Sequence, residues 1–306
     1  MSPLGEALGD YRYLRVRRQL GFKLELDGRL LEKFVAFVEQ ADAGTITTEL
    51  ALRWARLPAQ ARPHRWRQRL GIVRGFARYM ATIDPATEVP SPDLLPARAV
   101  RVAPYIYTDA DITSLMTAAG ALRPPLRAAT FQTLIGLLAA TGLRLGEALS
   151  LDRQHVDLKA GTLHVHAKQQ KQREVPVHAS TTAALSGYAR VRDRRWPQPK
   201  TAAFFVAQPG QRLDRSAVHY TFQRLIREVG LEGAGQRARP RPHDLRHRFA
   251  VHTLLDWHRA GVEVDRRLPL LSTYLGHRDP ADTQWYLEAL LALVAKRLDG
   301  ILEDRL

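Results

Sequence analysis

The chain has 306 residues, 45% of them hydrophobic and 25% charged, which excludes an intrinsically disordered protein and suggests about two globular domains. It contains no cysteine, which excludes disulfides and thiolate metal sites and is compatible with a reducing cytoplasm. Its net charge of +15 favours a polyanionic partner such as nucleic acid, because each Lys or Arg that meets a phosphate releases condensed counterions.

Neither a membrane span nor an export signal is predicted, so we expect no membrane partner. The longest apolar run, residues 133–143, contains two Gly and two Thr and is too short to cross a bilayer. The N-terminal sequence MSPLGEALGDYRYLRV is not a charged head followed by an apolar run, so we expect no signal peptide and a cytoplasmic location.

The first 85 residues are predicted to form a helical domain. Asp27 can cap a first helix, a second is expected at residues 47–56, and a third extends from about Arg62 to Thr82. The apolar faces of the first and third helices consist of Leu31, Phe34, Val35 and Val38, and of Trp66, Leu70, Val73, Ala77 and Met80.

The other faces of the third helix are strongly basic. Arg65, Arg69 and Arg74 are candidates for contact with a DNA backbone, since an amphipathic helix with a basic exposed side suits a row of phosphates. A solvated charged face without a ligand explains this pattern equally well. The next segment, residues 86–105, is rich in proline, has no sustained period and is predicted to be a linker.

The remainder, residues 106–306, is predicted to be a second domain, mainly α with a small antiparallel β element. Thr108 and Asp111 form a capping pattern, and residues 127–140 form an apolar, deeply buried helix. Gly142 is suited to end this helix in a left-handed conformation, and a short helix is expected to restart near Leu145.

A β-hairpin is predicted in the middle of this domain, because residues 162–166 and 174–177 alternate between apolar and polar side chains. The turn between them is basic and begins at Lys168. His164 and His166 lie on one face of the first strand, but no cysteine and no third ligand accompany them, so no metal site is expected. Helical periodicity returns after the hairpin.

Three segments of the second domain carry basic or nucleophilic side chains. The segment ATGLRLGEALSL presents Arg144 at a turn marked by glycine. The segment HDLRHRFAVHTL places His243 and Arg246 on one helix face, because they are three residues apart. The segment LGHRDPADTQWYL contains His277 and, nearer its end, Tyr286.

Each of these residues has an ordinary explanation when it is taken singly. An arginine after a helix is usually at the surface, and a tyrosine between Trp285 and Leu287 is typical of packing. Together, in this order and on a strongly basic chain, the three segments resemble the tyrosine recombinases of the phage integrase family.

The resemblance is carried by four motifs. The family's first Arg box is matched by TGLRLGEAL, its H-x-x-R box by HDLRHRFA, and its Leu-Gly-His box with the nucleophilic tyrosine by LGHRDPADTQWY. The family's hairpin lysine is matched by Lys168 in AKQQKQREVPV. The resemblance covers the whole second domain and extends loosely to the first, where this family places a small helical DNA-clamping domain.

Two departures from the family pattern leave the subfamily open. The distance from Arg246 to His277 is longer than is common, and the excess is assigned to an inserted or lengthened connection at residues 256–269. Asp282 and Thr283 stand before the Gln of the last box, where the family usually has two threonines.

The resemblance implies a site-specific recombinase that cleaves and rejoins DNA strands. Tyr286 would attack the scissile phosphate and form a 3′-phosphotyrosine, while Arg144 and Arg246 would bind the non-bridging oxygens. Lys168 would protonate the leaving 5′ oxygen.

The remaining residues of the motifs are expected to assist this step. His277 would hydrogen bond the phosphate, His243 would position it, and Glu147 would support the geometry. Because the covalent link retains the energy of the phosphodiester and basic side chains offset its charge, neither ATP nor a metal nor any other cofactor is expected.

The implied partners are double-stranded DNA at specific recombination sites in the bacterial nucleoid, further copies of the chain in a tetramer, and accessory recombinases. The long connection favours a mobile element. Apolar residues at helical spacing after Tyr286 predict a terminal helix that packs either on its own domain or on a neighbouring protomer. A type IB topoisomerase and a non-catalytic DNA-binding protein remain alternatives, and the target sequence stays open.

Overall fold

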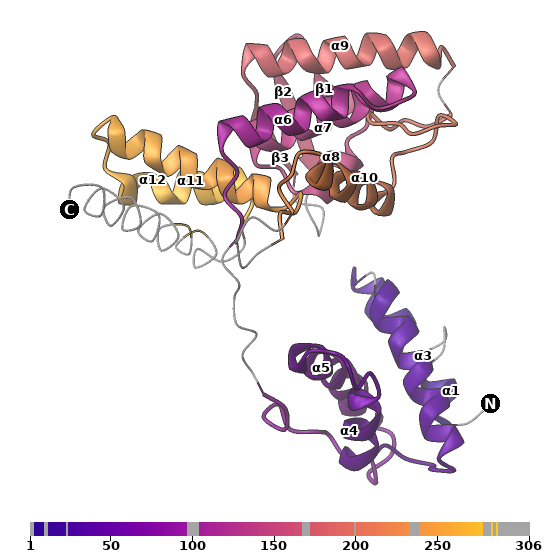
Figure 1. Cartoon of the computed structure of the whole chain (residues 1–306). Helices are drawn as coiled ribbons and strands as arrows, with labels where there is room; N and C mark the ends of the chain where they lie inside the picture. The colour runs from indigo at the N-terminus through magenta and orange to yellow at the C-terminus, as the bar shows by residue number, and fades with distance from the viewer. Residues whose placement is uncertain are drawn as a thin grey trace. The chain divides into compact units, whose positions relative to one another are not determined.

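The computed structural model describes residues 3–8, 12–22, 24–96, 104–166, 172–198, 200–232, 239–277, 283 and 286. The chain divides into two compact units, unit 1 (residues 1–101) and unit 2 (residues 102–306) (Figure 1). Unit 1 has one hydrophobic cluster, and unit 2 has a large cluster and a smaller one. In the described ranges, no helix is long and apolar enough to cross a membrane.

Unit 1 is built from helices that bury their apolar faces against one another. They are α1 (Pro3–Leu8), α2 (Tyr13–Gln19), α3 (Glu25–Gln40), α4 (Thr48–Arg56) and α5 (Pro63–Met80). The aromatic rings of Phe34 on α3 and Trp54 on α4 meet edge to face in this core. The predicted apolar face of α3 is buried, but Asp27 lies inside the first turn and is not the cap, because the helix already begins at Glu25.

The first part of the segment predicted as a linker, residues 86–96, belongs to unit 1 and packs against its helical part. The backbone N–H of Glu88 donates to the carbonyl of Ile46 at 2.8 Å, and the guanidinium of Arg74 donates to the carbonyl of Pro90 at 2.7 Å. Single hydrogen bonds of this kind leave no period in the sequence, so a proline-rich segment can be ordered without a helical or strand pattern.

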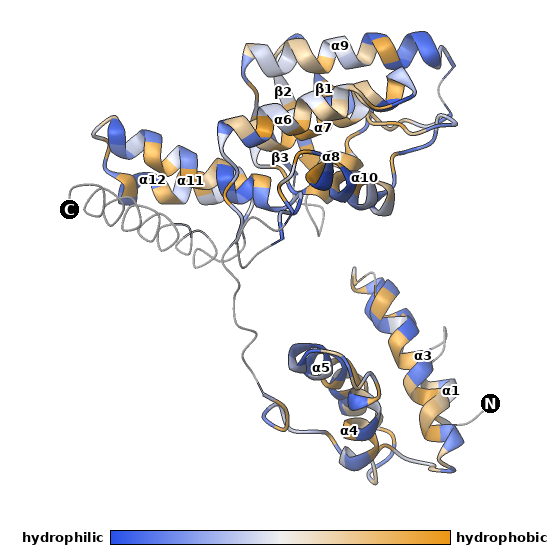
Figure 2. Ribbon diagram, viewed as in Figure 1, coloured by the Kyte–Doolittle hydropathy of each residue, from blue (hydrophilic) through white to orange (hydrophobic). Residues whose placement is uncertain are grey.

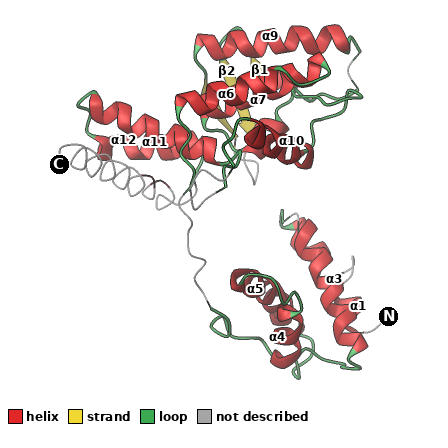
Figure 3. Cartoon of the chain, in the orientation of Figure 1, coloured by secondary structure: helices red, strands yellow, loops and turns green. Residues whose placement is uncertain are grey.

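Unit 2 combines helices with one small antiparallel sheet (Figure 3). Its helices are α6 (Asp109–Gly120), α7 (Pro125–Thr141), α8 (Leu145–Ser150), the 3-10 turn η1 (Arg153–His155), α9 (Ala179–Arg195), α10 (Arg215–Glu228), α11 (Asp244–Arg259) and α12 (Val264–Leu275). Its strands are β1 (Val156–Asp157), β2 (Thr162–His166) and β3 (Gln172–Pro176), in the order β1-β2-β3. The prediction of a mainly helical fold with a small antiparallel β element is confirmed.

The hairpin register places Leu163 opposite Val175, and both side chains are fully buried. The third strand, β1, was not predicted, because two residues are too short to show an alternation. Helix α7 is buried along most of its length and contacts α6, α9 and α11. It ends at Gly142, which has φ +60°, and α8 begins three residues later.

The smaller hydrophobic cluster of unit 2 joins α11 and α12, which lie side by side in Figure 1. Both helices show hydrophobic and hydrophilic stripes in Figure 2, as expected for helices that bury one face. Residues 256–269, predicted as a lengthened connection, are mostly helical: α11 continues to Arg259, a tight turn contains Gly261 at φ +67°, and α12 begins at Val264. The extra length therefore extends two helices that share a core.

Gly142→Ala is expected to destabilise unit 2 by about 1–3 kcal/mol. Its backbone is left-handed, and an added Cβ would lie 2.6 Å from Cδ1 of Phe249. The matched control is Gly146→Ala on α8, where an added Cβ meets nothing within 4 Å and helix propensity favours alanine. Chemical unfolding followed by circular dichroism measures both variants, and equal stability of the two would contradict this account.

Candidate active site

The predicted catalytic side chains of the described residues gather at the C-terminal end of α12. The carbonyl of Leu275 accepts hydrogen bonds from the guanidinium groups of Arg246 at 2.7 Å and Arg144 at 3.4 Å. The next carbonyl, that of Gly276, accepts one from Arg144 at 3.0 Å. The last carbonyls of a helix lack intrahelical partners and carry partial negative charge, so cations are stabilising there.

Arg246 is the more buried of these two arginines, with only 2% of its surface exposed. Its guanidinium also donates to the carbonyl of Gly142 at 2.9 Å and is hydrogen bonded to the side chain of Tyr286. Burial first, and then the charge of Arg144, lowers the pKa of Arg246 to about 10, while Tyr286 and Glu147 act in the opposite direction. Arg246 therefore stays charged at neutral pH.

The carboxylate of Glu147 is shared between Arg144 and a third arginine, Arg173. Its Oε2 accepts the backbone N–H of Arg144 at 2.9 Å, and its Oε1 accepts from the Arg144 guanidinium at 2.9 Å. Burial would raise the pKa of Glu147, but hydrogen bonds and charge from Arg173, and then from Arg144, lower it below its ordinary value. The carboxylate is therefore ionised and ties the two arginines together.

Arg173, on β3, is a site residue that the sequence analysis did not single out. Its Nη1 and Nη2 donate to the two oxygens of Glu147 at 3.1 and 2.9 Å, and its Nε donates to the carbonyl of Tyr274 at 2.9 Å. The strand pattern could have shown that Arg173 faces inward. Arg173 is two residues from the buried Val175, and alternate residues of a strand point to the same face.

Tyr286 is buried and contacts two histidine rings. Its ring is stacked on that of His277, with centroids 5.8 Å apart, and the centroid of His247 lies 5.5 Å away. Nδ1 of His277 is hydrogen bonded at 2.7 Å to the hydroxyl of Thr283, which is also buried. The phenol next to Arg246 is thus packed against two histidine rings.

Two histidines at the start of α11 are held in the neutral form. Crowding by protein atoms, and then the charges of Arg246 and other arginines, lowers the pKa of His243, although the residue is partly exposed to solvent. Burial, and then the neighbouring His243, lowers the pKa of His247 to about 3. His247 was not singled out, although it follows His243 by four residues and so shares its helix face.

The three arginines predicted to contact DNA differ in their surroundings. Arg65 is exposed on α5. The guanidinium of Arg69 lies 3.7 Å from the ring centroid of Trp54 and donates to the Trp54 carbonyl at 2.8 Å. Arg74 donates to backbone carbonyls of the segment that follows α5. Arg69 and Arg74 therefore have partners inside unit 1, and their contact with DNA stays a prediction.

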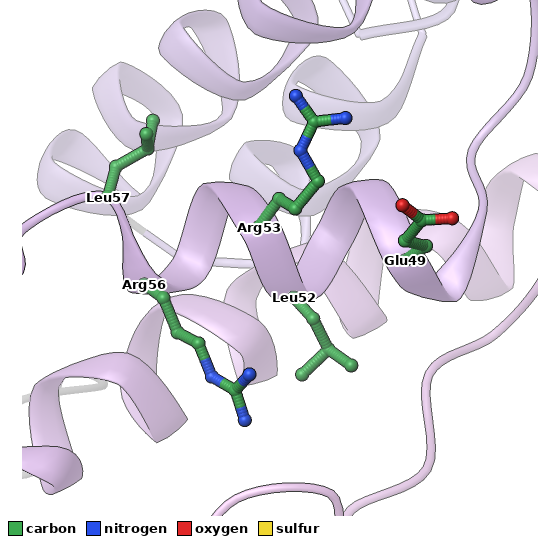
Figure 4. A pocket seen from close by; sticks show the side chains of 5 residues that line it. All are labelled: Glu49, Leu52, Arg53, Arg56 and Leu57. Carbon is green, nitrogen blue, oxygen red and sulfur yellow. The ribbon is translucent and has the colours of Figure 1, made fainter.

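Two predicted features lie outside the described residues. They are Lys168 in the hairpin turn and the helix expected after Tyr286. A shallow hollow on α4 contains none of the predicted catalytic residues (Figure 4). It is lined by Glu49, Leu52, Arg53, Arg56 and Leu57.

The histidines of β2 do not form a metal site with the rest of the described chain, in which no group of three or more His, Asp or Glu side chains is placed to hold a metal ion. The Nε2 atoms of His155 and His166 are 3.1 Å apart. Nδ1 of His155 accepts the backbone N–H of Asp152, so its Nε2 carries the hydrogen and donates it to His166. This pair is therefore a hydrogen bond.

The charges of the site suit a phosphate. The three arginines contribute three positive charges, Glu147 removes one, and the two histidines of α11 are neutral, which leaves a net charge of about +2. Glu147 pairs with both Arg144 and Arg173 and balances one positive charge between them, so the cluster keeps an excess of positive charge. Two forked cations beside a tyrosine can bind two oxygens of one phosphodiester.

Comparison with known proteins agrees with this arrangement. A model of the phage integrase family matches residues 107–291. The chain is 45% identical, over 100% of both chains, to a Sinorhizobium fredii protein named as an integrase/recombinase, y4rB. It is 34% identical to the tyrosine recombinase XerC of Azotobacter vinelandii, over 76% of this chain and 72% of that protein.

A solved structure shares the fold. The Tn1549 transposon integrase in complex with transposon right end DNA superposes with a TM-score of 0.64 at 16% identity, over 94% of this chain and 97% of that one. The family model and the relatives named as recombinases define the class of tyrosine recombinases. Since the family model spans more than half of the chain and a relative matches it over its full length, the chain belongs to the phage integrase family.

His247→Asn is expected to make the protein less sensitive to acid. The pKa of His247 is about 3 in the folded protein and about 6.5 in an unfolded chain, so the unfolded chain binds more protons as the pH falls below about 6.5. Between pH 7 and pH 5 this costs the wild type about 1–2 kcal/mol of stability, which the variant should keep.

Thermal unfolding at the two pH values measures this difference. His64→Asn on the exposed start of α5 is the control and should behave as the wild type. An equal fall in Tm for wild type and His247→Asn would show that His247 is not the group that titrates.

Proposed function

We propose that this chain is a site-specific DNA recombinase that cleaves and rejoins DNA strands through a 3′-phosphotyrosine on Tyr286. The observation that carries the proposal is the contact of Tyr286 with Arg246, whose guanidinium shares the carbonyl of Leu275 with Arg144. A nucleophile and two cations are thereby held at one helix end, where a single phosphodiester can meet all three.

Cleavage of a phosphodiester requires charge compensation, because the negative phosphate repels an incoming nucleophile. A tyrosine hydroxyl, with an ordinary pKa of about 10, is weak until its proton is drawn away. Arg144, whose side chain is 38% exposed, and Arg246 would bind the two non-bridging oxygens. They would stabilise the charge that develops on the five-coordinate phosphorus.

The proton movements follow from the same groups. The Tyr286 oxygen forms the new bond to phosphorus as the bond to the 5′ oxygen breaks. Neutral His243 would position the phosphate and take up the tyrosine proton, Lys168 would donate a proton to the 5′ oxygen, and His277 would hydrogen bond the phosphate. The 5′ hydroxyl of another strand reverses the step, so the chemistry balances without ATP or a metal ion.

The proposed partner is double-stranded DNA at specific recombination sites. Unit 1 would act as the DNA-clamping domain, with Arg65 as its exposed candidate for phosphate contact. Exchange between two duplexes requires four cleaved strands and one Tyr286 for each, so the assembly is proposed to be a homotetramer on DNA, with accessory recombinases as further partners. The likeness of the chain to a protein named as an integrase/recombinase and to a transposon integrase supports a role in a mobile element.

Wild-type protein is expected to form a covalent DNA adduct that Tyr286→Phe lacks. Because the target is unknown, DNA would be recovered from denatured wild-type protein in cells, sequenced, and rebuilt as a synthetic duplex with a nick beside the cleavage point, which traps the intermediate. The phenylalanine variant keeps the ring contacts with His277 and His247 and removes only the attacking oxygen.

Three outcomes separate the competing activities. An adduct on the recovered duplex, absent in the variant, supports the recombinase. Binding without an adduct in the wild type would leave a non-catalytic DNA-binding protein. Relaxation of supercoiled plasmid irrespective of sequence, without joining of two duplexes, would instead indicate a type IB topoisomerase.

Lys168→Ala is expected to slow cleavage while DNA binding stays near the wild-type level, because the 5′ oxygen leaves poorly without a proton. General acid catalysis contributes about 10²–10⁴-fold, so a loss in that range is expected. A duplex with sulfur in place of the scissile 5′ oxygen needs no protonation and should restore the rate. Failure of this substrate to rescue the variant would rule out the acid role.

A further inference from the structure

Arg173 links three elements that carry the proposed catalytic groups. Its backbone lies on β3, its fork holds both oxygens of Glu147 on α8, and its Nε holds the carbonyl of Tyr274 near the end of α12. Only 13% of its side chain is exposed, against 38% for Arg144. The two arginines therefore differ in their surroundings. Arg173 is enclosed by protein groups, whereas more than a third of the Arg144 side chain is exposed to solvent.

The arrangement makes Arg173 and Arg144 competitors for one carboxylate. Glu147 has two oxygens, and the fork of Arg173 engages both of them. The Arg144 guanidinium is left with a single contact to Oε1 and reaches the carbonyls of Leu275 and Gly276 instead. Without Arg173, both oxygens would be open to a bidentate pair with Arg144, which would draw that guanidinium away from a phosphate.

The backbone at Gly276 supplies independent evidence that the site is shaped around Arg173. Gly276 ends α12 at φ +67°, and an added Cβ would lie 2.8 Å from Nη1 of Arg173. His277 follows directly, and its N–H donates to the carbonyl of Ser272 at 3.0 Å. The position of His277 thus depends on a turn that closes against the Arg173 guanidinium.

We propose that Arg173 is a positioning residue for DNA cleavage: by occupying Glu147 it keeps Arg144 free for the scissile phosphate, and by holding the end of α12 it sets the place of His277. This inference rests on the proposed recombinase activity. Arg173 acts through Glu147 and the α12 end, and it is not required to touch the DNA.

The test compares cleavage of two synthetic duplexes that carry the recovered site. One has an ordinary scissile phosphate, and the other has a methylphosphonate there, in which a methyl group replaces one charged oxygen. Arg173→Ala is expected to cleave the ordinary duplex about 10²-fold more slowly, as for a displaced catalytic group, with binding nearly unchanged. On the neutral duplex its deficit relative to wild type should shrink to less than about 10-fold, since less cationic stabilisation is needed.

Arg144→Ala is the reference for this pattern, because it removes the cation itself. The matched control is Arg153→Ala, which also removes a part-buried arginine paired with a carboxylate, that of Asp193 on α9. Arg153 belongs to η1 and to none of the catalytic motifs. Any deficit it causes should be the same on both duplexes.

A second pair of variants keeps the test decisive if Arg173→Ala folds poorly. Arg173→Lys retains the charge but cannot hold both oxygens of Glu147, so it should show a deficit with the same relief on the neutral duplex. Arg173→Ala combined with Glu147→Gln removes the competing carboxylate and leaves no unpaired buried charge, so cleavage of the ordinary duplex should recover at least about 10-fold over Arg173→Ala.

The outcomes are distinguishable. Wild-type rates in Arg173→Ala, or an equal deficit on both duplexes, would overturn the positioning role while leaving the recombinase intact. Absence of an adduct in the wild-type protein would instead overturn the proposed function. Thermal unfolding of every variant reports the structural loss separately, because Tm does not depend on the charge of the scissile phosphate.

Discussion

The carbonyl end of α12 is the feature on which the rest of the site depends. Three successive carbonyls, at residues 274–276, accept hydrogen bonds from Arg173, Arg144 and Arg246. These arginines come from three separate segments and would repel one another if nothing held them. The unsatisfied carbonyls and the partial negative charge at a helix end offset part of that repulsion, and Glu147 offsets more. A cluster of cations can therefore exist before any DNA arrives.

Hydrophobic packing decides where this helix end lies. Leu254 of α11 and Leu271 and Leu275 of α12 are almost completely buried in one cluster, so the two helices are held side by side. The start of α11 then carries Arg246 to the end of α12. The deeply buried α7 fixes the turn at Gly142, whose carbonyl accepts from Arg246. Apolar packing thus sets the distances between arginines that would otherwise repel one another.

The sequence predicted those features that local pattern controls. The buried α7, the left-handed Gly142 and the motif residues follow from spacing and from the resemblance. Arg173 was missed because its role depends on Glu147, which is distant along the chain, and a strand pattern shows only that it faces inward. For a related reason, helical period does not reveal that the Arg69 guanidinium stacks on Trp54, and its contact with DNA stays a prediction. Likewise, residues 256–269 lengthen α11 and α12, which depends on a shared core that no local window contains.

The balance of charge favours the proposed transition state over the bound substrate. The described site carries about +2, because Glu147 balances one charge of its three arginines. Burial keeps His247 neutral, and crowding and arginine charges keep His243 neutral. In the proposed reaction a phosphodiester brings one negative charge and gains a second as the fifth bond forms, while the tyrosine proton moves to His243, so the arginines interact more strongly with the five-coordinate state than with the bound substrate. A protonated His243 could not accept the tyrosine proton, so the neutral form is the one that the proposed step requires. Neutral His243 beside fixed arginines thus suits the proposed step, because the histidine can accept the tyrosine proton while the arginines supply the positive charge.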